Sequence, residues 1–353
     1  MQRRLSYAVI ALASSAALVA GCGGGSSGGS TGSTGATGTN NSSQTPSAEL
    51  TSAFSNLSKA QTLTLGLHLD TDAATLKGIA SDSSSTLTDA QANAIAGAKI
   101  QIEVVAPSGK TIGDLSSGGS TGAAVDFTVS DNGTNWVTIR SVNKTLYVQA
   151  AVKDILDAVG QGQMYAQLQA GVAQAPSFVQ ALFQGKWVSL PESAASSLTG
   201  SSGSGSGQQA QQLVDGLKQI LANDVTVTRT DTGTTDTLEL KANSRTLASD
   251  FVTTFSSLVP QAQSALSQAD PSSVPNRDIV VNAGVTNAAL SQLSIDFGQF
   301  SPDPATNHLP LVVDIAETGP AITAPSGAVQ VNTQELGQLF GSLLGGNLGS
   351  GVG

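Results

Sequence analysis

The sequence predicts an α+β fold in which a large, curved antiparallel sheet is covered by helices. Segments that alternate apolar and polar residues recur along the chain, which is the pattern of strands with one buried face. Helical patterns are inserted between groups of strands and do not follow every strand, as they would in a doubly wound sheet. Consecutive strands should therefore pair as antiparallel neighbours.

The first group of strands follows a short amphipathic helix predicted over 48–60, with Thr45 or Ser47 as its N-cap. Hairpin turns are expected at Asp131-Asn132-Gly133 and Val142-Asn143-Lys144, the first because Asn and Gly adopt positive φ readily. Alternation predicts strands at Leu63–Leu69, Ile100–Val104, Val125–Val129 and Leu146–Val148. These segments predict a meander.

The second half of the chain mixes helices with further strands. Residues 151–183 predict helices broken at Gly160-Gln161-Gly162 and at Pro176, and Trp187–Leu190 predicts a short strand. The Gly/Ser composition of 200–207 predicts a flexible loop. Helices are expected over 213–221 and 244–268, and a short one over 334–344. The remaining strands are predicted at 225–227, 238–240, 279–283, 290–297 and 309–315, which brings the sheet to about ten strands.

The N-terminal sequence predicts export and membrane anchoring. Arg3 and Arg4 precede an apolar run from Leu5 to Ala20, which at about 16 residues is shorter than the roughly 20 that cross a bilayer. The run ends in Val19-Ala20-Gly21-Cys22, which resembles a bacterial lipobox, where the cysteine thiol receives diacylglycerol. An ordinary signal peptide with a chance cysteine is the alternative. It is disfavoured because the sole cysteine falls at this boundary.

Residues 23–45 predict a disordered tether, because they contain no apolar side chain larger than alanine. Such a tether spans about 25 to 30 Å on average. Diacylglycerol and a further acyl chain such as palmitate would hold Cys22 in the membrane, each buried methylene contributing ~0.8 kcal/mol. The expected location is therefore the outer face of the bacterial cell membrane, in the cell envelope.

Composition excludes several classes of function. The chain has 25 acidic and 15 basic residues, a formal charge of −10, which opposes nucleic-acid binding because phosphates are neutralised by Lys and Arg. One Cys and two His exclude an intramolecular disulfide and a zinc cage of His and Cys ligands. We expect no metal and no cofactor.

No catalytic constellation is recognisable, so we expect no enzyme. His68 falls on the strand face opposite the leucines, and His308 lies in a loop, so both are interpreted as solvated or hydrogen-bonded side chains. Ser141 and Lys144 match S-x-x-K, but that motif opens a helix in β-lactamases, and here it lies at a hairpin. Asp70 and Asp72, and likewise Asp224 and Asp231, lack the spacing of a calcium loop. Trp187 and Tyr147 are interpreted as core or rim anchors.

The apolar faces of the strands are the candidate lining of a ligand cavity. The sequence leaves open whether these side chains line a cavity or form a sealed core. The candidate residues are Leu65, Leu67, Ile102, Val104, Phe127, Val129, Val227, Leu240, Ile295 and Phe297.

Several short motifs follow one another along the chain in a recognisable order. The lipobox and tether are followed by Asn143-Lys144-Thr145-Leu146-Tyr147-Val148 and by Gly185-Lys186-Trp187-Val188-Ser189-Leu190-Pro191. Further along come Asp278–Asn282, Leu293–Phe297 and the closing Ile322-Thr323-Ala324-Pro325. Together these motifs resemble the actinobacterial LppX/LprG-type lipoproteins. The resemblance covers residues 46–325, while 71–97 and 150–184 are longer than a minimal member needs. It implies a half-barrel sheet wrapped on a helical layer, similar in shape to the LolA and LolB carriers, and binding of lipids or lipoglycans in transit across the envelope.

We therefore expect four segments: a signal peptide over 1–21, the lipidated Cys22 and tether over 22–45, one half-barrel domain over 46–325, and a loose Gly-rich tail over 326–353. The expected function is non-catalytic: a lipid carrier or chaperone that is anchored to the membrane and binds acyl chains of a lipid or lipoglycan in an apolar cavity. The alternative is an envelope lipoprotein that acts as a sensor or structural scaffold, with a filled core and no lipid ligand.

Overall fold

The computed structural model of the chain describes residues 44–82, 86–115, 122–191, 225–232, 234–247, 249–250, 276–300 and 308–332. The predicted signal peptide, Cys22 and nearly all of the tether lie outside these residues. So do the loop predicted at 200–207, the helices predicted over 213–221 and 334–344, and most of the helix predicted over 244–268.

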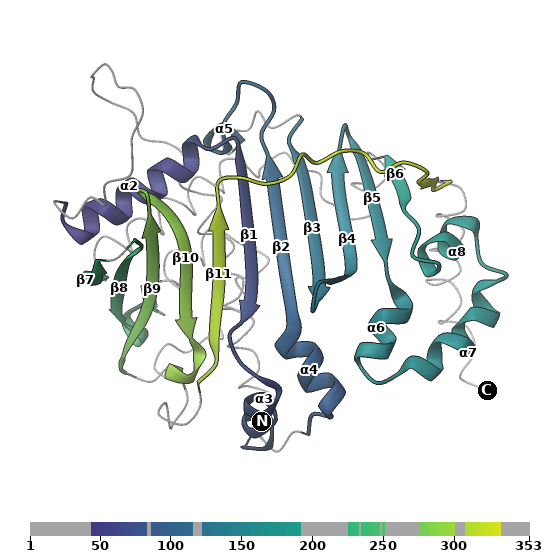
Figure 1. The fold of residues 1–353 in the computed structure, drawn as a ribbon, viewed down its shortest axis with the longest axis horizontal. Helices are drawn as coiled ribbons and strands as arrows, with labels where there is room; N and C mark the ends of the chain where they lie inside the picture. Colours follow the sequence, from purple (N-terminus) through teal and green to yellow (C-terminus); the bar gives the residue numbers. More distant parts are fainter. Residues whose placement is uncertain are drawn as a thin grey trace, which may run out of the picture. The chain divides into compact units, whose positions relative to one another are not determined.

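The described residues form twelve strands in one sheet, in the order β12-β6-β5-β4-β3-β2-β1-β11-β10-β9-β8-β7. The sheet is open, with β12 and β7 as its edges (Figure 1). This confirms the α+β class with a large sheet. One pairing departs from the antiparallel prediction, because β12 runs parallel to β6. A long connection precedes β12, and a parallel pair requires such a crossover where a hairpin would give an antiparallel one.

The chain divides into two compact units. Unit 1 comprises residues 1–71, 103–123 and 203–320, and unit 2 comprises residues 72–102, 124–202 and 321–353. Strand β2 (Ala98–Val105) contributes residues to both. The prediction of one domain over 46–325 stays a prediction.

Unit 1 combines antiparallel strands with helix α2, which contacts β7 and β10. Thr45 caps α2, since its hydroxyl oxygen accepts a hydrogen bond from the Ala48 amide at 3.4 Å, and Leu50, Ala53 and Leu57 form the buried face of the helix. The elements of unit 1 are α2 (Pro46–Lys59), β1 (Thr62–Leu69), α5 (Ile112–Leu115), β7 (Thr226–Thr232), β8 (Asp236–Asn243), β9 (Asp278–Thr286), β10 (Ala289–Asp296), the 3-10 helix η2 (Phe297–Phe300) and β11 (Pro310–Ala316).

A bulge in β10 decides which of its side chains share a face. Leu290 pairs with Val285 and Gln292 with Gly284, so Ser291 is the extra residue on β10. Leu290 and Leu293, three residues apart, therefore point to the same side of the sheet. Leu290 is 1% exposed, and Leu293 pairs with the fully buried Ala283.

Unit 2 contains the remaining strands and the longer helical insertions. The hairpin turns predicted there are confirmed, with positive φ at Asn132, Gly133, Asn143 and Lys144. The helix breaks predicted at 160–162 and at Pro176 are also confirmed. The elements are α3 (Ala73–Asp82), α4 (Asp89–Gly97), β3 (Ala124–Asp131), β4 (Thr134–Val142), β5 (Thr145–Ala150), α6 (Val152–Ala158), α7 (Gly162–Val172), α8 (Ser177–Phe183), β6 (Val188–Pro191) and β12 (Val329–Gln330).

Two helices of unit 2 occur where the sequence patterns predicted none. Helix α3 and helix α4 occupy most of residues 73–97. Helix α4 begins with a capping box, in which Thr88 accepts from the Gln91 amide and the Gln91 side chain accepts from the Thr88 amide. Its buried residues are Ala92 and Ala94, which are too small to give a visible hydrophobic period.

The strand predicted over 290–297 ends one residue earlier, at Asp296. The Asp296 carboxylate accepts hydrogen bonds from the amides of Gly298 and Leu309, both at 2.8 Å, which turns the chain into η2. Phe297 is therefore the first residue of η2 and leaves the alternation of the strand.

Candidate functional site

The apolar side chains of unit 1 converge on one face of its strands. In antiparallel pairs, residues directly opposite each other share a face. Leu65 pairs with Ile315, Leu67 with Val313, Ile295 with both Leu311 and Val281, and Leu240 with both Val281 and Val227. The structure thus brings five candidate residues to one face: Leu65, Leu67, Val227, Leu240 and Ile295.

Part of that face is closed. Leu238 and Ala283 are fully buried, and Val285 is 3% exposed. Strand β8 alternates between buried and less buried positions over nearly its whole length, as a strand does whose apolar face is covered. Of the candidates, Leu65 and Leu240 are buried, whereas Leu67, Val227 and Ile295 are partly buried.

The apolar face of unit 2 is built by β3 to β6. Phe127 pairs with Ile139 and Val129 with Val137, and the register continues from Ile139 to Val148 and from Val148 to Val188. The candidates Phe127 and Val129 therefore lie on one face with neighbouring apolar residues. We call this the β3–β5 apolar face; it consists of Val125, Phe127, Val129, Val137, Ile139, Leu146, Val148 and Ala150.

This face is only partly covered. All eight residues of β3 and all six of β5 are intermediate in exposure, and none is buried. At one side, helix α8 packs on the sheet, where Phe178 and Ala181 form a buried cluster with Val188 and Val331. The cover from α8 reaches β5 and β6 but does not bury β3.

Of the remaining three candidates, Phe297 lies in η2 and the other two lie on β2. Ile102 and Val104 are two residues apart, so they point to the same side of that strand, and both are partly buried. The candidate lining as a set stays a prediction. Three partly exposed apolar residues were not among the candidates, although the hairpin turns place them on the same face. Val137 and Ile139 of β4 lie opposite Val129 and Phe127, and Val148 of β5 lies opposite Ile139.

The opposite face of β3 to β6 carries a network of polar side chains. Arg140 Nε donates to Asp126 Oδ2 at 2.6 Å, and its Nη1 donates to the Thr323 carbonyl at 2.8 Å. The guanidinium also lies 5.3 Å from the centre of the Trp187 ring, a cation–π arrangement. This contact fits the interpretation of Trp187 as an anchor, although β6 begins at Val188 and not at Trp187 as predicted.

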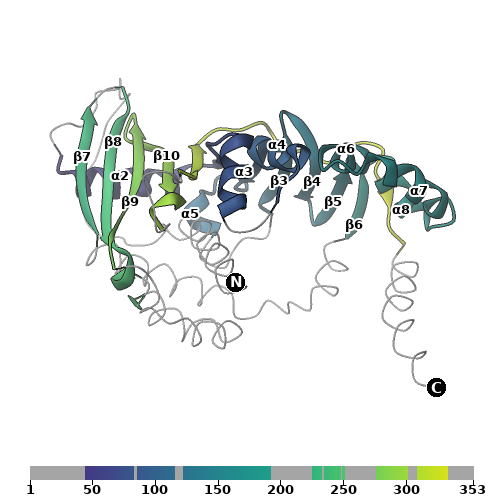
Figure 2. The same ribbon diagram turned by 90° about the horizontal axis from the view of Figure 1, so that it is seen from below.

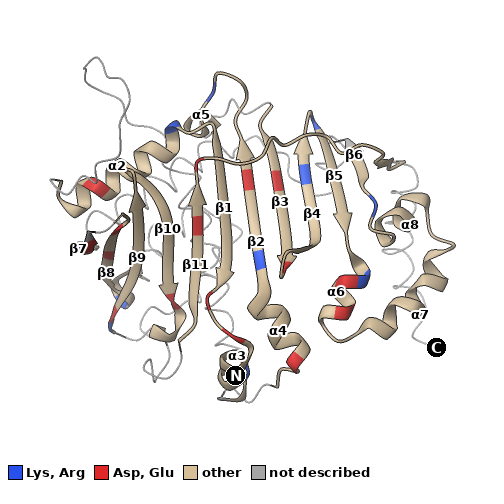
Figure 3. Cartoon of the chain, viewed as in Figure 1, with Lys and Arg blue, Asp and Glu red and all other residues tan. Residues whose placement is uncertain are grey.

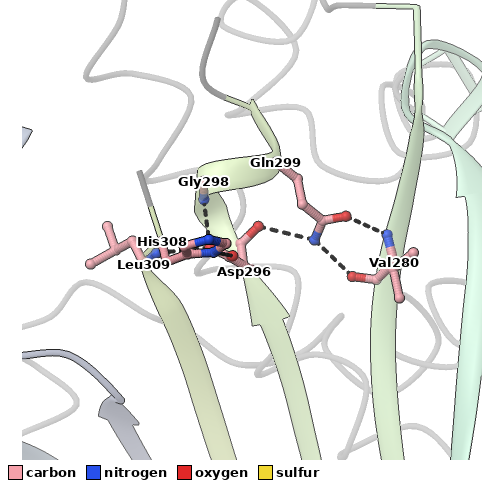
Figure 4. A network of polar contacts seen from close by, with 6 residues as sticks. All are labelled: Val280, Asp296, Gly298, Gln299, His308 and Leu309. Carbon is pink, nitrogen blue, oxygen red and sulfur yellow. Dashed lines mark hydrogen bonds and ion pairs between the residues drawn. The ribbon is translucent and has the colours of Figure 1, made fainter. Parts of the chain in front are cut away.

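The two histidines lie beside carboxylates. His68 Nδ1 is 3.5 Å from Asp314 Oδ2, and His308 Nδ1 is 2.8 Å from Asp296 Oδ2. Figure 4 shows the second pair within a network in which Gln299 also bridges Asp296 to Val280 of β9. Burial acts to raise the pKa of Asp296, but the hydrogen bonds from His308 and from two backbone amides outweigh it and lower that pKa. The network joins η2 to β9 and to the start of β11, so we interpret it as stabilising the fold.

Within the described part of the chain, no group of three or more His, Cys, Asp or Glu residues could hold a metal ion. Among the helices that the structure describes, none is long and apolar enough to cross a membrane.

Comparisons with known proteins find similarity among solved structures. No protein-family model matches the chain, and no curated protein matches it. Among solved structures, the chain is similar to the Mycobacterium tuberculosis lipoprotein LppX, with 10% sequence identity, a TM-score of 0.32, and coverage of 78% of this chain and 97% of that chain. The function proposed below rests on this chain's own residues.

Proposed function

We propose that the chain is an exported, lipid-anchored protein of the cell envelope that binds acyl chains of a lipid or glycolipid on the β3–β5 apolar face, without catalysis. The observation that carries the proposal is the partial exposure of this face. A row of apolar side chains on three adjacent strands is intermediate in exposure and so remains in partial contact with solvent, and sites for apolar ligands are lined mostly by apolar side chains.

The chemistry of the face favours a hydrocarbon ligand. Its residues are apolar, and Ser141, which lies among them opposite Val125 and Leu146, is uncharged. The charged Asp126 and Arg140 lie on the other face and bind each other. Six residues of strand extend about 20 Å, so the face is long and narrow. Helix α8 covers one side of it, which would shelter an acyl chain from water while leaving the β3 side accessible.

The proposed anchor is Cys22. Small residues precede it and an uncharged Gly/Ser-rich segment follows it, the arrangement that a lipobox and tether require. Changing Cys22 to Ala should abolish acylation of the exported chain, measured by incorporation of a radiolabelled fatty acid. Incorporation that persists in this variant would show that the anchor lies elsewhere.

Binding is tested by titrating the chain from residue 22, carrying Cys22→Ser, with a fluorescent fatty acid. The Phe127→Asn variant should weaken uptake by about tenfold, because it removes one large apolar contact worth about 1.5 to 3 kcal/mol. Thr128→Asn is the matched control, since Thr128 neighbours Phe127 on the opposite face of β3, and it should bind as the unchanged chain does. Equal affinities of the unchanged chain and both variants would show that the fatty acid does not bind on this face.

A further inference from the structure

Helix α7 combines three properties that are unusual together. It spans Gly162–Val172, and none of its residues is buried. Met164 and Leu168 are each 43% exposed, and their i, i+4 spacing places them side by side on the helix surface. Exposed helices of soluble proteins normally carry charged residues on the outer face, but α7 carries none.

The absence of charge extends beyond α7. From Ala158 to Gly185 the chain has no Asp, Glu, Lys or Arg, whereas a stretch of this length would carry about three at the overall 11%. Figure 3 shows both α7 and α8 without a charged residue, between the acidic residues of α6 and the basic residue before β6. The exposed polar residues of α7 are glutamines, Gln163, Gln167 and Gln169.

The helix is nevertheless held in place. The Tyr165 ring stacks on the Phe183 ring of α8, with centroids 4.6 Å apart and planes 8° from parallel. Figure 2 shows α7 beside α8 in unit 2. The Tyr165 stacking thus holds α7 against α8, while Met164 and Leu168 of the same helix stay exposed to solvent.

We propose that α7 is a membrane-contact element, which inserts Met164 and Leu168 into the interfacial region of the lipid bilayer. Entry into that region is opposed by charged side chains, whose desolvation is costly, and this helix has none to desolvate. The inference rests on the proposed function, because a protein tethered to a membrane presents its surface to lipid continually. It adds to that function a surface through which acyl chains reach the neighbouring α8 and the sheet.

A bilayer fits this surface better than a protein partner does. Protein interfaces are typically rimmed by charged and hydrogen-bonding groups that set the partner's orientation. The other residues of α7 are Tyr165, Val172, alanines, glycines and glutamines, which provide no charge for such recognition. Without Lys or Arg on the helix, attraction to anionic headgroups is absent, so binding should be driven by apolar burial alone.

The test uses the chain from residue 22 with Cys22→Ser, so that no acyl anchor contributes. Flotation with phosphatidylcholine vesicles should recover the protein in the lipid fraction, equally at low salt and at high salt. Met164→Glu with Leu168→Glu should reduce the bound fraction about tenfold or more, since both apolar contacts are replaced by charge. Ala166→Glu with Ala170→Glu is the matched control: both residues are exposed, have the same spacing and lie on the other side of the helix.

Three results would overturn the proposal: no flotation of the unsubstituted protein, full flotation of the Met164 and Leu168 variant, or an equal loss in the control variant. Uptake of fluorescent fatty acid without vesicles separates this proposal from the proposed function. A defect in α7 alone leaves uptake intact, whereas failure of the proposed function abolishes uptake in every variant and leaves flotation unchanged.

Discussion

Arg140 links three parts of unit 2 through a single side chain. Its guanidinium binds Asp126 on the neighbouring strand, the carbonyl of Thr323 and the face of Trp187. Thr128 donates a further hydrogen bond to the other carboxylate oxygen of Asp126. Arg140 therefore holds the extended segment before β12 on the sheet through the Thr323 carbonyl. The planar guanidinium of arginine can make these three contacts at once.

Arg140→Lys should destabilise the protein by about 2 kcal/mol, because lysine keeps the charge but cannot make the same set of directed contacts. The free energy of unfolding in urea measures this effect. Thr323→Ala is the control, since the hydrogen bond uses the backbone carbonyl of residue 323, and it should leave stability nearly unchanged. Arg140→Lys with the stability of the unsubstituted chain would mean that these contacts contribute little.

Asp296 makes the stability of unit 1 depend on pH. Its pKa in the folded state is lowered, so its carboxylate stabilises the fold at pH values above the pKa in the unfolded chain, about 3.9. This contribution is lost as the pH falls through the folded-state pKa. Asp296→Asn should therefore lower Tm near neutral pH, with a difference from the unsubstituted protein that shrinks as the pH approaches 3.

Thermal unfolding at a series of pH values measures that difference. His308→Ala should have the smaller effect at neutral pH, because the amides of Gly298 and Leu309 still bind Asp296. A Tm difference for Asp296→Asn that stays constant with pH would show that the Asp296 carboxylate does not cause the pH dependence.

Helix α2 is joined to the sheet by buried charge as well as by apolar packing. Glu49 of α2 forms an ion pair with Arg229 of β7, and Asp236 of β8 is buried beside them. Burial raises the pKa of Glu49, the Arg229 guanidinium acts to lower it, and the Asp236 carboxyl acts to raise it further. Arg229 thus provides the positive charge beside two acidic side chains, Glu49 and Asp236.

Removing the arginine should be the more harmful change. Arg229→Met leaves Glu49 and Asp236 together without a positive partner, whereas Glu49→Gln leaves Arg229 with Asp236 still nearby. In guanidinium chloride, the unfolding midpoint of Arg229→Met should lie clearly below that of Glu49→Gln. The reverse order would show that Asp236 does not depend on Arg229.

Among the helices and strands, long periodic segments could be predicted from the sequence, whereas short or alanine-rich segments could not. The alternation of β1 and the breaks between α6, α7 and α8 were predictable because leucine, glycine and proline mark them strongly. Helix α4 buries only alanines, and β12 has two residues, so neither has a period to detect. The turn at Asn287 and Ala288 could not be predicted, because Ala288 adopts positive φ and alanine, unlike glycine, does not indicate such a conformation in a sequence.

For the whole molecule, the sequence could predict which side chains share a face but not what covers them. Leu238 and Leu240 in β8 alternate in the same way as Phe127 and Val129 in β3. Yet Leu238 and Leu240 are buried, whereas Phe127 and Val129 remain partly exposed. Coverage depends on segments distant in sequence, such as α2 and α8, and alternation along one strand carries no information about them.

Native mass spectrometry of the chain from residue 22, purified without added lipid and carrying Cys22→Ser, measures occupancy of the β3–β5 apolar face most directly. We expect a population heavier than the polypeptide by the mass of one lipid, which organic solvent releases and which Phe127→Asn reduces but Thr128→Asn does not. A single mass equal to that of the polypeptide, unchanged after incubation with fatty acid, would contradict the account.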